Sequence, residues 1–406
     1  QTVEANVFEN TTILGQLDRD LITLEVLTPM IDLLGWGSLS GPAGERPRLA
    51  MLLRIDQVLL GEDSLSVDEI ALNLRRDYFD ASFDGSDLSG RVERTGSGPI
   101  LIDLERLAFH GDRNFLDPPS EDLLSAFNPG QIPSLRLTIG ALIRGETVYE
   151  DVEVTAISGE SRLDVTEFLF VRKGQRFQGE LSWVYQNGQP KSALVLRADG
   201  AELGRLLRVN QDAALLDAKE GVLSVDLTWN ASPLGFSMLT SEGVVKLALG
   251  DGRFLDLGNS AEALRLFGIL NIETLTRRLR LDFLDLINPG LAFDRVFAKA
   301  RIKEGMLIMD PAMTMTGPSS NFRLTGESDL GLETLNYRLE VDVPLTNNLP
   351  IASIILGAPQ VGGAIYLAER VLGKKIIKVG KTAYKIEGTF GEPQIKFIPP
   401  FSELKD

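Results

Sequence analysis

Short runs of alternating apolar and polar residues recur from about residue 48 almost to the end of the chain. They constrain the fold more than any other feature of the sequence. Clear runs lie at 49–55, 70–74, 135–139, 181–185, 223–229, 245–249 and 335–343. Successive side chains of a strand point to opposite faces, so each run gives a strand with one apolar and one polar face. The pattern predicts a mainly β protein.

Turn-forming pairs separate several of these runs. They are Glu62-Asp63, Asn187-Gly188, Asp251-Gly252 and Glu304-Gly305. Such pairs join neighbouring strands through tight turns, which indicates a meander of antiparallel hairpins.

Helical spacing is rare. It occurs at Ser120–Phe127, at Ala201–Val209 and at Ala261–Arg278, where Ser260 is a candidate N-cap. These segments are too few to cover a sheet of roughly 20 strands, which must fold into a sandwich, close into a barrel or curl into an open trough. The alternation pattern alone favours the sandwich and leaves the barrel and the open trough as alternatives.

Residues Pro350–Lys374 form an apolar run that Gly357-Ala358-Pro359 divides. A membrane-spanning helix needs about 20 unbroken apolar residues, so we expect a pair of shorter helices on a membrane or capping an apolar cavity. A buried helical hairpin is an equal alternative. The second helix is amphipathic, with Val361, Ile365, Ala368 and Leu372 on one face. The lysines that follow indicate either contact with lipid phosphates or a solvated strand edge.

The formal net charge is -16, from 57 acidic and 41 basic residues. Nucleic-acid binding needs a basic face, so the charge argues against nucleic acid as a partner. The chain has no cysteine, which excludes disulfides, thiolate metal sites and cysteine nucleophiles. It opens at Gln1 without a charged or an apolar targeting region, and we expect it to be a fragment of a longer protein.

Catalytic motifs are missing from the sequence. A histidine-based triad or metal site would rest on the one histidine, His110, which we interpret as a surface loop residue. Phosphate-binding glycine motifs are absent too. Paired carboxylates stay an open alternative, although most acidic residues fall at outward strand positions. We therefore predict no enzyme, no catalytic residue, no cofactor and no metal.

Four segments, in this order along the chain, resemble the AsmA-like family of bacterial envelope proteins, in particular the C-terminal region of its YhdP branch. They are GVLSVDLTW (221–229) with LALGDGRFLDL (247–257), LRLFGILNIETLTRRLRLDFLDL (264–286) with GLAFD (290–294), GAPQVGGAIYLAERVLGK (357–374), and YKIEGTFGEPQ (384–394). The resemblance covers roughly residues 130–400 and is weaker before them. Met309-Asp310-Pro311 departs from it, because a proline there interrupts a strand run and leaves the pairing open.

The resemblance implies a long, curled antiparallel β-sheet that forms an open hydrophobic groove, with a few short helices and a C-terminal helical pair. Such proteins resemble bridges that carry phospholipids between the inner and outer membrane. By resemblance, the chain would lie in the periplasm of a Gram-negative bacterium, anchored in the inner membrane through a missing N-terminal segment, with its C-terminal end near the outer membrane. The implied division is a weaker β-groove segment at 1–130, the main groove at 131–349, and the helical pair, basic segment and terminal strand at 350–406.

The site residues implied by the resemblance form two sets, a groove lining and a set of membrane contacts. The alternative interpretation of the first set is the core of an ordinary β-sandwich. The expected groove lining is Leu223, Val225, Leu227, Trp229, Val245, Leu247, Leu249, Val296, Ala298, Ala300, Ile302, Met313, Met315, Phe322, Leu324, Tyr337, Leu339, Val341 and Val343. The expected membrane contacts are Ile351, Ile354, Ile355, Val361, Ile365, Leu372, Lys374, Lys375 and Lys378.

Two other functions remain open. An envelope scaffold that assists the assembly of outer-membrane components would need no continuous apolar lining. An adhesin-like β-solenoid would need a short, fixed repeat, and the irregular spacing of the runs argues against it.

Overall fold

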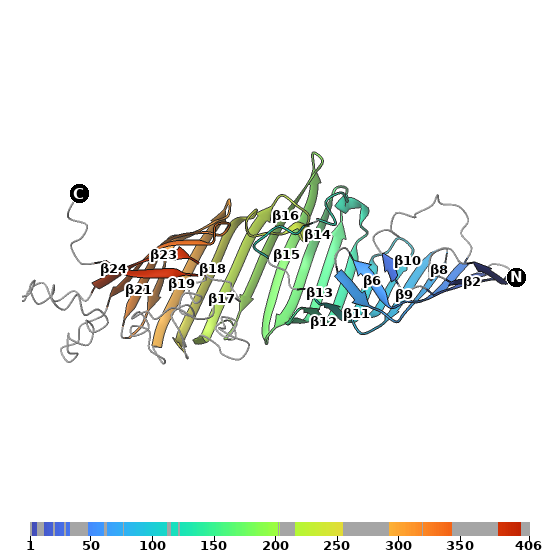
Figure 1. Cartoon of the computed structure of the whole chain (residues 1–406), viewed down its shortest axis with the longest axis horizontal. Helices are drawn as coiled ribbons and strands as arrows, with labels where there is room; N and C mark the ends of the chain where they lie inside the picture. The colour runs from blue at the N-terminus through green and yellow to red at the C-terminus, as the bar shows by residue number, and fades with distance from the viewer. Residues whose placement is uncertain are drawn as a thin grey trace, which may run out of the picture. The chain divides into compact units, whose positions relative to one another are not determined.

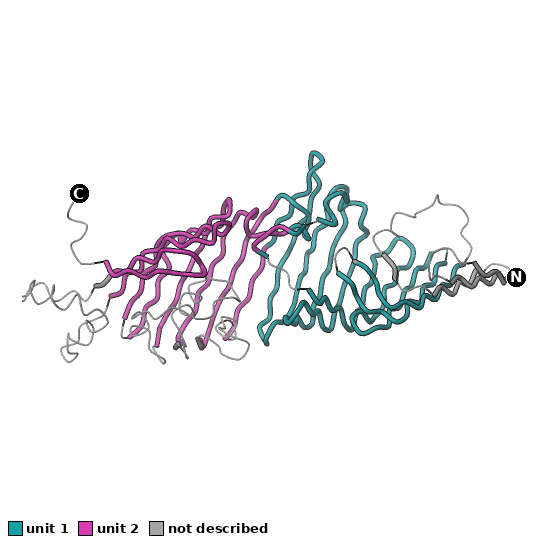
Figure 2. The backbone as a smooth tube through the Cα atoms, in the orientation of Figure 1, with its two compact units in different colours: residues 1–115, 119–194, 230–235 teal, residues 116–118, 195–229, 236–406 magenta. Residues whose placement is uncertain are grey.

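The computed structural model of the chain describes residues 2–5, 12–18, 21–27, 30–32, 48–60, 63–75, 77–111, 115–120, 122–201, 203, 216–254, 292–318, 320–342 and 381–398 (Figure 1). The chain forms two compact units (Figure 2). Unit 1 comprises residues 1–115, 119–194 and 230–235, and unit 2 comprises 116–118, 195–229 and 236–406. The division at 130 and 350 expected from the sequence stays a prediction.

Unit 1 is built on one large, open sheet. Its strands are β1 (Thr2–Ala5), β2 (Thr12–Asp18), β3 (Leu21–Leu27), β5 (Arg48–Arg54), β8 (Glu69–Arg75), β9 (Tyr78–Asp84), β10 (Leu88–Thr95), β11 (Ile100–Phe109), β12 (Leu135–Arg144), β13 (Thr147–Ser158), β14 (Arg162–Arg172) and β15 (Gln175–Gln186). Each strand pairs with the next in this order. Strand β16 (Gln189–Asp199) belongs partly to each unit.

Two pairings in this otherwise antiparallel sheet are parallel. They join β3 to β5 and β11 to β12. A parallel pair needs a crossover connection instead of a tight turn. Between β11 and β12 that connection is a long loop, described at residues 110–111, 115–120 and 122–134, which contains the short 3-10 helix η1 (Pro129–Gln131).

A small sheet and the long loop cover parts of one face of unit 1. The small sheet consists of β4 (Met30–Asp32), β6 (Gln57–Leu60) and β7 (Asp63–Ser66), with β4 parallel to β6. Val58 and Leu65 of this sheet are buried against β5, β8 and β10–β13. Leu124 and Ile132 of the loop pack against Trp183, which is 1% exposed. Unit 1 is therefore locally two-layered, as the sandwich interpretation expects.

Unit 2 is an open antiparallel sheet. Its strands pair in chain order and are β17 (Leu216–Trp229), β18 (Glu242–Phe254), β19 (Ala292–Lys303), β20 (Met306–Thr316), β21 (Asn321–Asp329), β22 (Thr334–Asp342), β23 (Lys381–Thr389) and β24 (Pro393–Ile398). A 3-10 helix, η2 (Pro233–Gly235), lies in the β17–β18 connection. The predicted mainly β, open antiparallel architecture is confirmed.

Two of the predicted turns are confirmed and one is wrong. Asn187-Gly188 and Glu304-Gly305 connect β15 to β16 and β19 to β20, and both residues of each pair have positive φ, as a tight hairpin turn requires. Asp251-Gly252 lies inside β18 instead, with Asp251 at a φ of 39°. The sequence pair alone did not distinguish a turn from a local distortion within a strand.

The helix predicted at Ser120–Phe127 is wrong. The described residues there form two successive turns, with hydrogen bonds from Ser125 N to Asp122 O and from Phe127 N to Leu124 O. The side chain of Asp122 accepts from Leu124 N at 3.2 Å, and such local bonds compete with a helix. The helices expected at Ala201–Val209 and Ala261–Arg278 lie outside the described residues, except for Ala201 and Leu203. The C-terminal helical pair lies outside them entirely.

Candidate functional site

The sheet of unit 2 has one continuous apolar face, made of four rows of side chains that run across the strands. We call it the apolar face of unit 2. The register places its members opposite one another, from β17 to β22 in the first row and from β17 to β24 in the other three. The first two rows are Gly221, Leu249, Val296, Met315, Phe322 and Val341, and Leu223, Leu247, Ala298, Met313, Leu324, Leu339, Tyr384 and Phe397. The other two are Val225, Val245, Ala300, Met309, Gly326, Tyr337, Ile386 and Ile395, and Leu227, Gly243, Ile302, Leu307, Ser328, Leu335, Gly388 and Pro393.

The predicted lining residues lie together on this face. Only Val343 lies outside the described residues. Trp229, at the end of β17, is 3% exposed and packs edge-on against Phe236, with ring centroids 5.0 Å apart. The sequence prediction missed Leu307, Met309, Leu335, Tyr384, Ile386, Ile395 and Phe397. Alternation within β20, β22, β23 and β24 is the signal that identifies them.

The face is more exposed at β17 and β18 than at β20–β22. Leu223, Val225, Val245 and Leu247 are only partly buried. Leu339, by contrast, is 0% exposed. Accessible side chains of this face therefore lie at β17 and β18, and again at β23 and β24, where Tyr384, Ile395 and Phe397 are partly buried.

The proline in β20 does not interrupt the face. Val296 pairs with Met315, and after a register shift Ala300 pairs with Met309. The shift falls at Asp310-Pro311, so the proline sits in a bulge, where a missing N–H costs no ladder hydrogen bond. Met309 and Met313, on either side of the bulge, are both buried. The pairing that the sequence left open is therefore continuous on both sides of the proline.

One buried polar pair lies on the otherwise apolar face. The hydroxyl groups of Ser328 and Tyr337 are 2.8 Å apart, and each residue is 1% exposed. Burial raises the pKa of Tyr337 to about 12, against the opposing effect of the hydrogen bond with Ser328. The pair satisfies both hydroxyls without exposing the face to water.

The opposite face of unit 2 is polar. Glu387 forms ion pairs with Lys385 at 2.6 Å and with Lys396 at 3.3 Å. The hydrogen bond from Lys385, followed by that from Lys396, lowers the pKa of Glu387. Val222 stands on this face next to Leu223 and is 55% exposed. The two faces of the sheet thus differ sharply in polarity.

Unit 1 carries a comparable apolar face, of which parts are covered. One of its rows runs through Met51, Leu72, Ala81, Val92, Ile102, Leu137, Val154 and Phe168. Another runs through Leu53, Ile70, Phe83, Gly90, Leu104, Ile139 and Val152. The small sheet and the loop 110–134 pack on this face as described above. The prediction had placed no lining residues in this unit.

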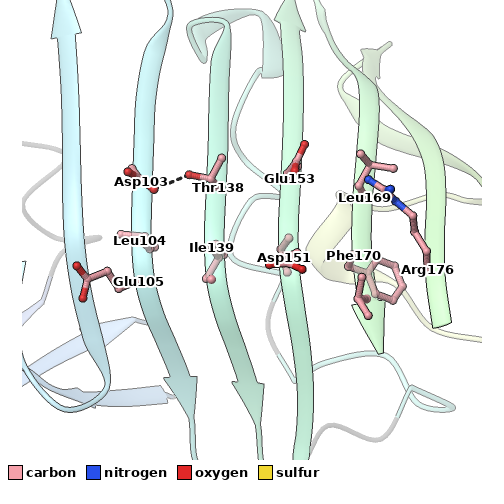
Figure 3. Close-up of a pocket in the computed structure, with 13 residues that line it drawn as sticks. Asp103, Leu104, Glu105, Thr138, Ile139, Asp151, Glu153, Leu169, Phe170 and Arg176 are labelled. Carbon is pink, nitrogen blue, oxygen red and sulfur yellow. Dashed lines mark hydrogen bonds between the residues drawn. The ribbon is translucent and has the colours of Figure 1, made fainter. Parts of the chain in front are cut away.

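A depression of about 470 Å³ lies across β11–β15 of unit 1 (Figure 3). Four carboxylates line it, together with Arg176: Asp103, Glu105, Asp151 and Glu153. Thr138 donates to Asp103 at 2.6 Å. Within the part of the chain that the structure describes, no group of three or more His, Cys, Asp or Glu residues could hold a metal ion.

His110 forms a hydrogen bond with a buried aspartate. Its Nε2 lies 2.8 Å from Asp87 Oδ2, and the side chains are 72% and 6% exposed, respectively. Asp87 also accepts from Ser66 N at 2.9 Å. Burial raises the pKa of Asp87, but the hydrogen bonds from Ser66 and His110 outweigh it and lower the pKa below its ordinary value. The arrangement ties the segment around residue 87 to β7 and to the end of β11.

The predicted membrane-contact residues, Ile351 to Lys378, lie outside the described residues. Among the residues that the structure does describe, no helix is both long enough and apolar enough to span a membrane.

Comparison with known proteins identifies a family for this chain. The family model described as YhdP protein matches residues 3–395, most of the chain. A relative from Escherichia coli (strain K12), the intermembrane phospholipid transporter YhdP, is 26% identical over 248 residues. That match covers 61% of this chain and 19% of the relative's length. No solved structure matches the chain.

Proposed function

The chain belongs to the YhdP family, and from this premise we propose that it carries phospholipids between two membranes of the bacterial envelope. Its apolar faces hold the acyl chains, and the polar headgroups stay in water. In this proposal the chain acts as one part of a longer bridge in the periplasm, with its C-terminal end toward the outer membrane. It transports its ligand and does not transform it.

The observation that carries the proposal is the unbroken apolar face of unit 2. Its four rows contain no charged residue, from β17 to β22 in the first row and from β17 to β24 in the other three. Adjacent strands lie about 4.8 Å apart, so the rows extend along the direction in which strands are added. An acyl chain that moves along them meets chemically similar side chains at each step, which favours sliding over trapping at one position.

The energetics support such a surface. Each CH₂ group exposed to water costs about 0.8 kcal/mol, so two acyl chains in water cost on the order of 20 kcal/mol. A surface of Leu, Val, Ile, Phe and Met side chains offsets most of this cost. The partly exposed residues at β17 and β18 give the acyl chains a place of entry.

A matched pair of substitutions in β17 tests the proposal. Val225 lies on the apolar face and is partly buried, whereas Val222 is 55% exposed on the polar face. Val225→Asp places a carboxylate where an acyl chain would lie, and we expect it to lower bound phospholipid at least about tenfold. Val222→Asp adds the same charge to the same strand and should leave bound phospholipid unchanged.

The measurement is phospholipid bound per chain, by native mass spectrometry and lipid extraction of the purified full chain. Thermal unfolding followed by circular dichroism establishes that both variants fold. Lipid in the wild type that disappears only in Val225→Asp supports transport. A folded wild-type chain without phospholipid, or equal lipid in both variants, refutes it and favours the envelope scaffold.

A further inference from the structure

Two arginines stand at one rim of the apolar face of unit 1. Arg144 and Arg172 are the last residues of β12 and β14. Each guanidinium lies over an aromatic ring of the same face: Arg144 over Phe109, 5.0 Å from the ring centroid, and Arg172 over Tyr149, at 6.0 Å. Charged groups are therefore placed where the apolar face ends.

The aromatic residues continue from this rim onto the face. Tyr149 meets Phe170 edge-on with ring centroids 5.6 Å apart, and Phe170 stacks on Phe177 at 4.6 Å. Phe168 follows, with its centroid 5.3 Å from that of Phe170. Aromatic side chains with a polar group beside them are typical of the boundary between hydrocarbon and water in membranes.

The two arginines differ in their partners. Arg144 forms an ion pair with Asp63 of β7, with Nη1 2.9 Å from Oδ2. The Nε atoms of both arginines are buried and have no hydrogen-bond acceptor among the residues that the structure describes. A buried donor without an acceptor costs free energy that a ligand oxygen restores. Because Asp63 already neutralises Arg144, Arg172 is the arginine that is available to an anion.

We propose that Arg172 binds the phosphate of a phospholipid whose acyl chains lie along Phe170 and Phe168. The inference rests on the proposed function and names a headgroup site for it. A guanidinium matches a phosphodiester because its planar N–H groups reach two oxygens at once. From Arg172 to Phe168 a strand spans about 13 Å at about 3.3 Å per residue. This is close to half of the roughly 30 Å hydrocarbon thickness of a bilayer, the length of one acyl chain.

Calorimetric titration of the delipidated full chain tests the site with two soluble probes. Dioctanoylphosphatidylglycerol carries the phosphate, and dioctanoylglycerol carries the same acyl chains without it. We expect Arg172→Gln to weaken binding of the phosphate-bearing lipid about tenfold and to leave dioctanoylglycerol unchanged. Arg136→Gln is the control, because Arg136 is exposed on the opposite face of β12. It should change neither affinity.

Each other outcome has a distinct meaning. If both lipids bind and Arg172→Gln changes neither, the headgroup site is refuted and the proposed function stands. If Arg172→Gln weakens both lipids equally, Arg172 supports the face rather than the phosphate, which also refutes the site. If glycerol 3-phosphate alone binds as tightly as the lipid, the site takes a free anion, and the headgroup site is refuted. If neither lipid binds the wild type, the proposed function fails together with the inference.

Discussion

The hydrogen bond between Ser328 and Tyr337 offers a quantitative test of how dry the apolar face of unit 2 is. Both residues are 1% exposed, and their hydroxyl oxygens lie 2.8 Å apart. Tyr337→Phe removes one hydroxyl and leaves that of Ser328 buried without a partner. The expected loss of unfolding free energy is about 1–3 kcal/mol. Ser328→Ala should lower the unfolding free energy by a similar amount, because it leaves the hydroxyl of Tyr337 buried without a partner.

The double variant distinguishes a site that excludes water from one that water reaches. With both hydroxyls removed, no polar group is left buried without a hydrogen-bond partner. The double variant Tyr337→Phe with Ser328→Ala should therefore lose less unfolding free energy than the sum of the losses of the two single variants. We expect a coupling of about 1–2 kcal/mol. Urea denaturation followed by far-UV circular dichroism measures all four proteins. Tyr78→Phe is the control, because the hydroxyl of Tyr78 accepts an exposed hydrogen bond from Arg91 at 3.0 Å; its cost should stay within about 0.5 kcal/mol.

The same pair predicts a response to alkaline pH. Burial raises the pKa of Tyr337 to about 12, so between pH 10 and 12 the folded chain holds a proton that the unfolded chain releases. Stability must therefore fall as the pH rises through this range, and Tyr337→Phe should remove that part of the fall. Single-variant costs that simply add, together with an unchanged alkaline profile, would mean that water reaches these hydroxyls and that the face is not dry.

Two further predictions concern other parts of the chain. The lowered pKa of Asp87 stabilises the folded state at pH values above the ordinary carboxyl pKa, and this contribution is lost as the pH falls below about 4. The difference in melting temperature between the wild type and Asp87→Asn should therefore shrink on acidification. A constant difference would contradict this linkage between protonation and stability. Gly326 and Gly188 both have a positive φ, 127° and 78°, so an alanine at either position is strained in its backbone. A Cβ at residue 326 would in addition lie 2.2 Å from Asn336 O, whereas one at residue 188 meets nothing within 4 Å. Gly326→Ala should therefore lower the melting temperature far more than Gly188→Ala, and equal shifts in a thermal melt would contradict this interpretation of the β21–β22 contact.

The sequence by itself determined the fold class and part of the membership of the apolar face in unit 2, although the prediction missed the members named above. Alternation with a period of two assigns Leu223, Val225, Tyr337 and Leu339 to one face, because the pleat of a strand leaves no other choice. The resemblance to the AsmA-like family, in its YhdP branch, is confirmed by the family match. The membrane-contact residues and the division into three parts stay predictions.

Only the tertiary structure decided which residues face inward beyond a bulge. From Leu163 and Val165, alternation would place Val171 on the apolar face; a register shift between Val165 and Phe168 puts Phe168, Phe170 and Arg172 there instead. A second shift, at Asp151, turns Tyr149 inward and leaves Val148 42% exposed. A bulge changes the parity of every residue after it, and its position depends on the partner strand. The meeting of Arg172 with Tyr149 therefore could not be predicted from either run alone.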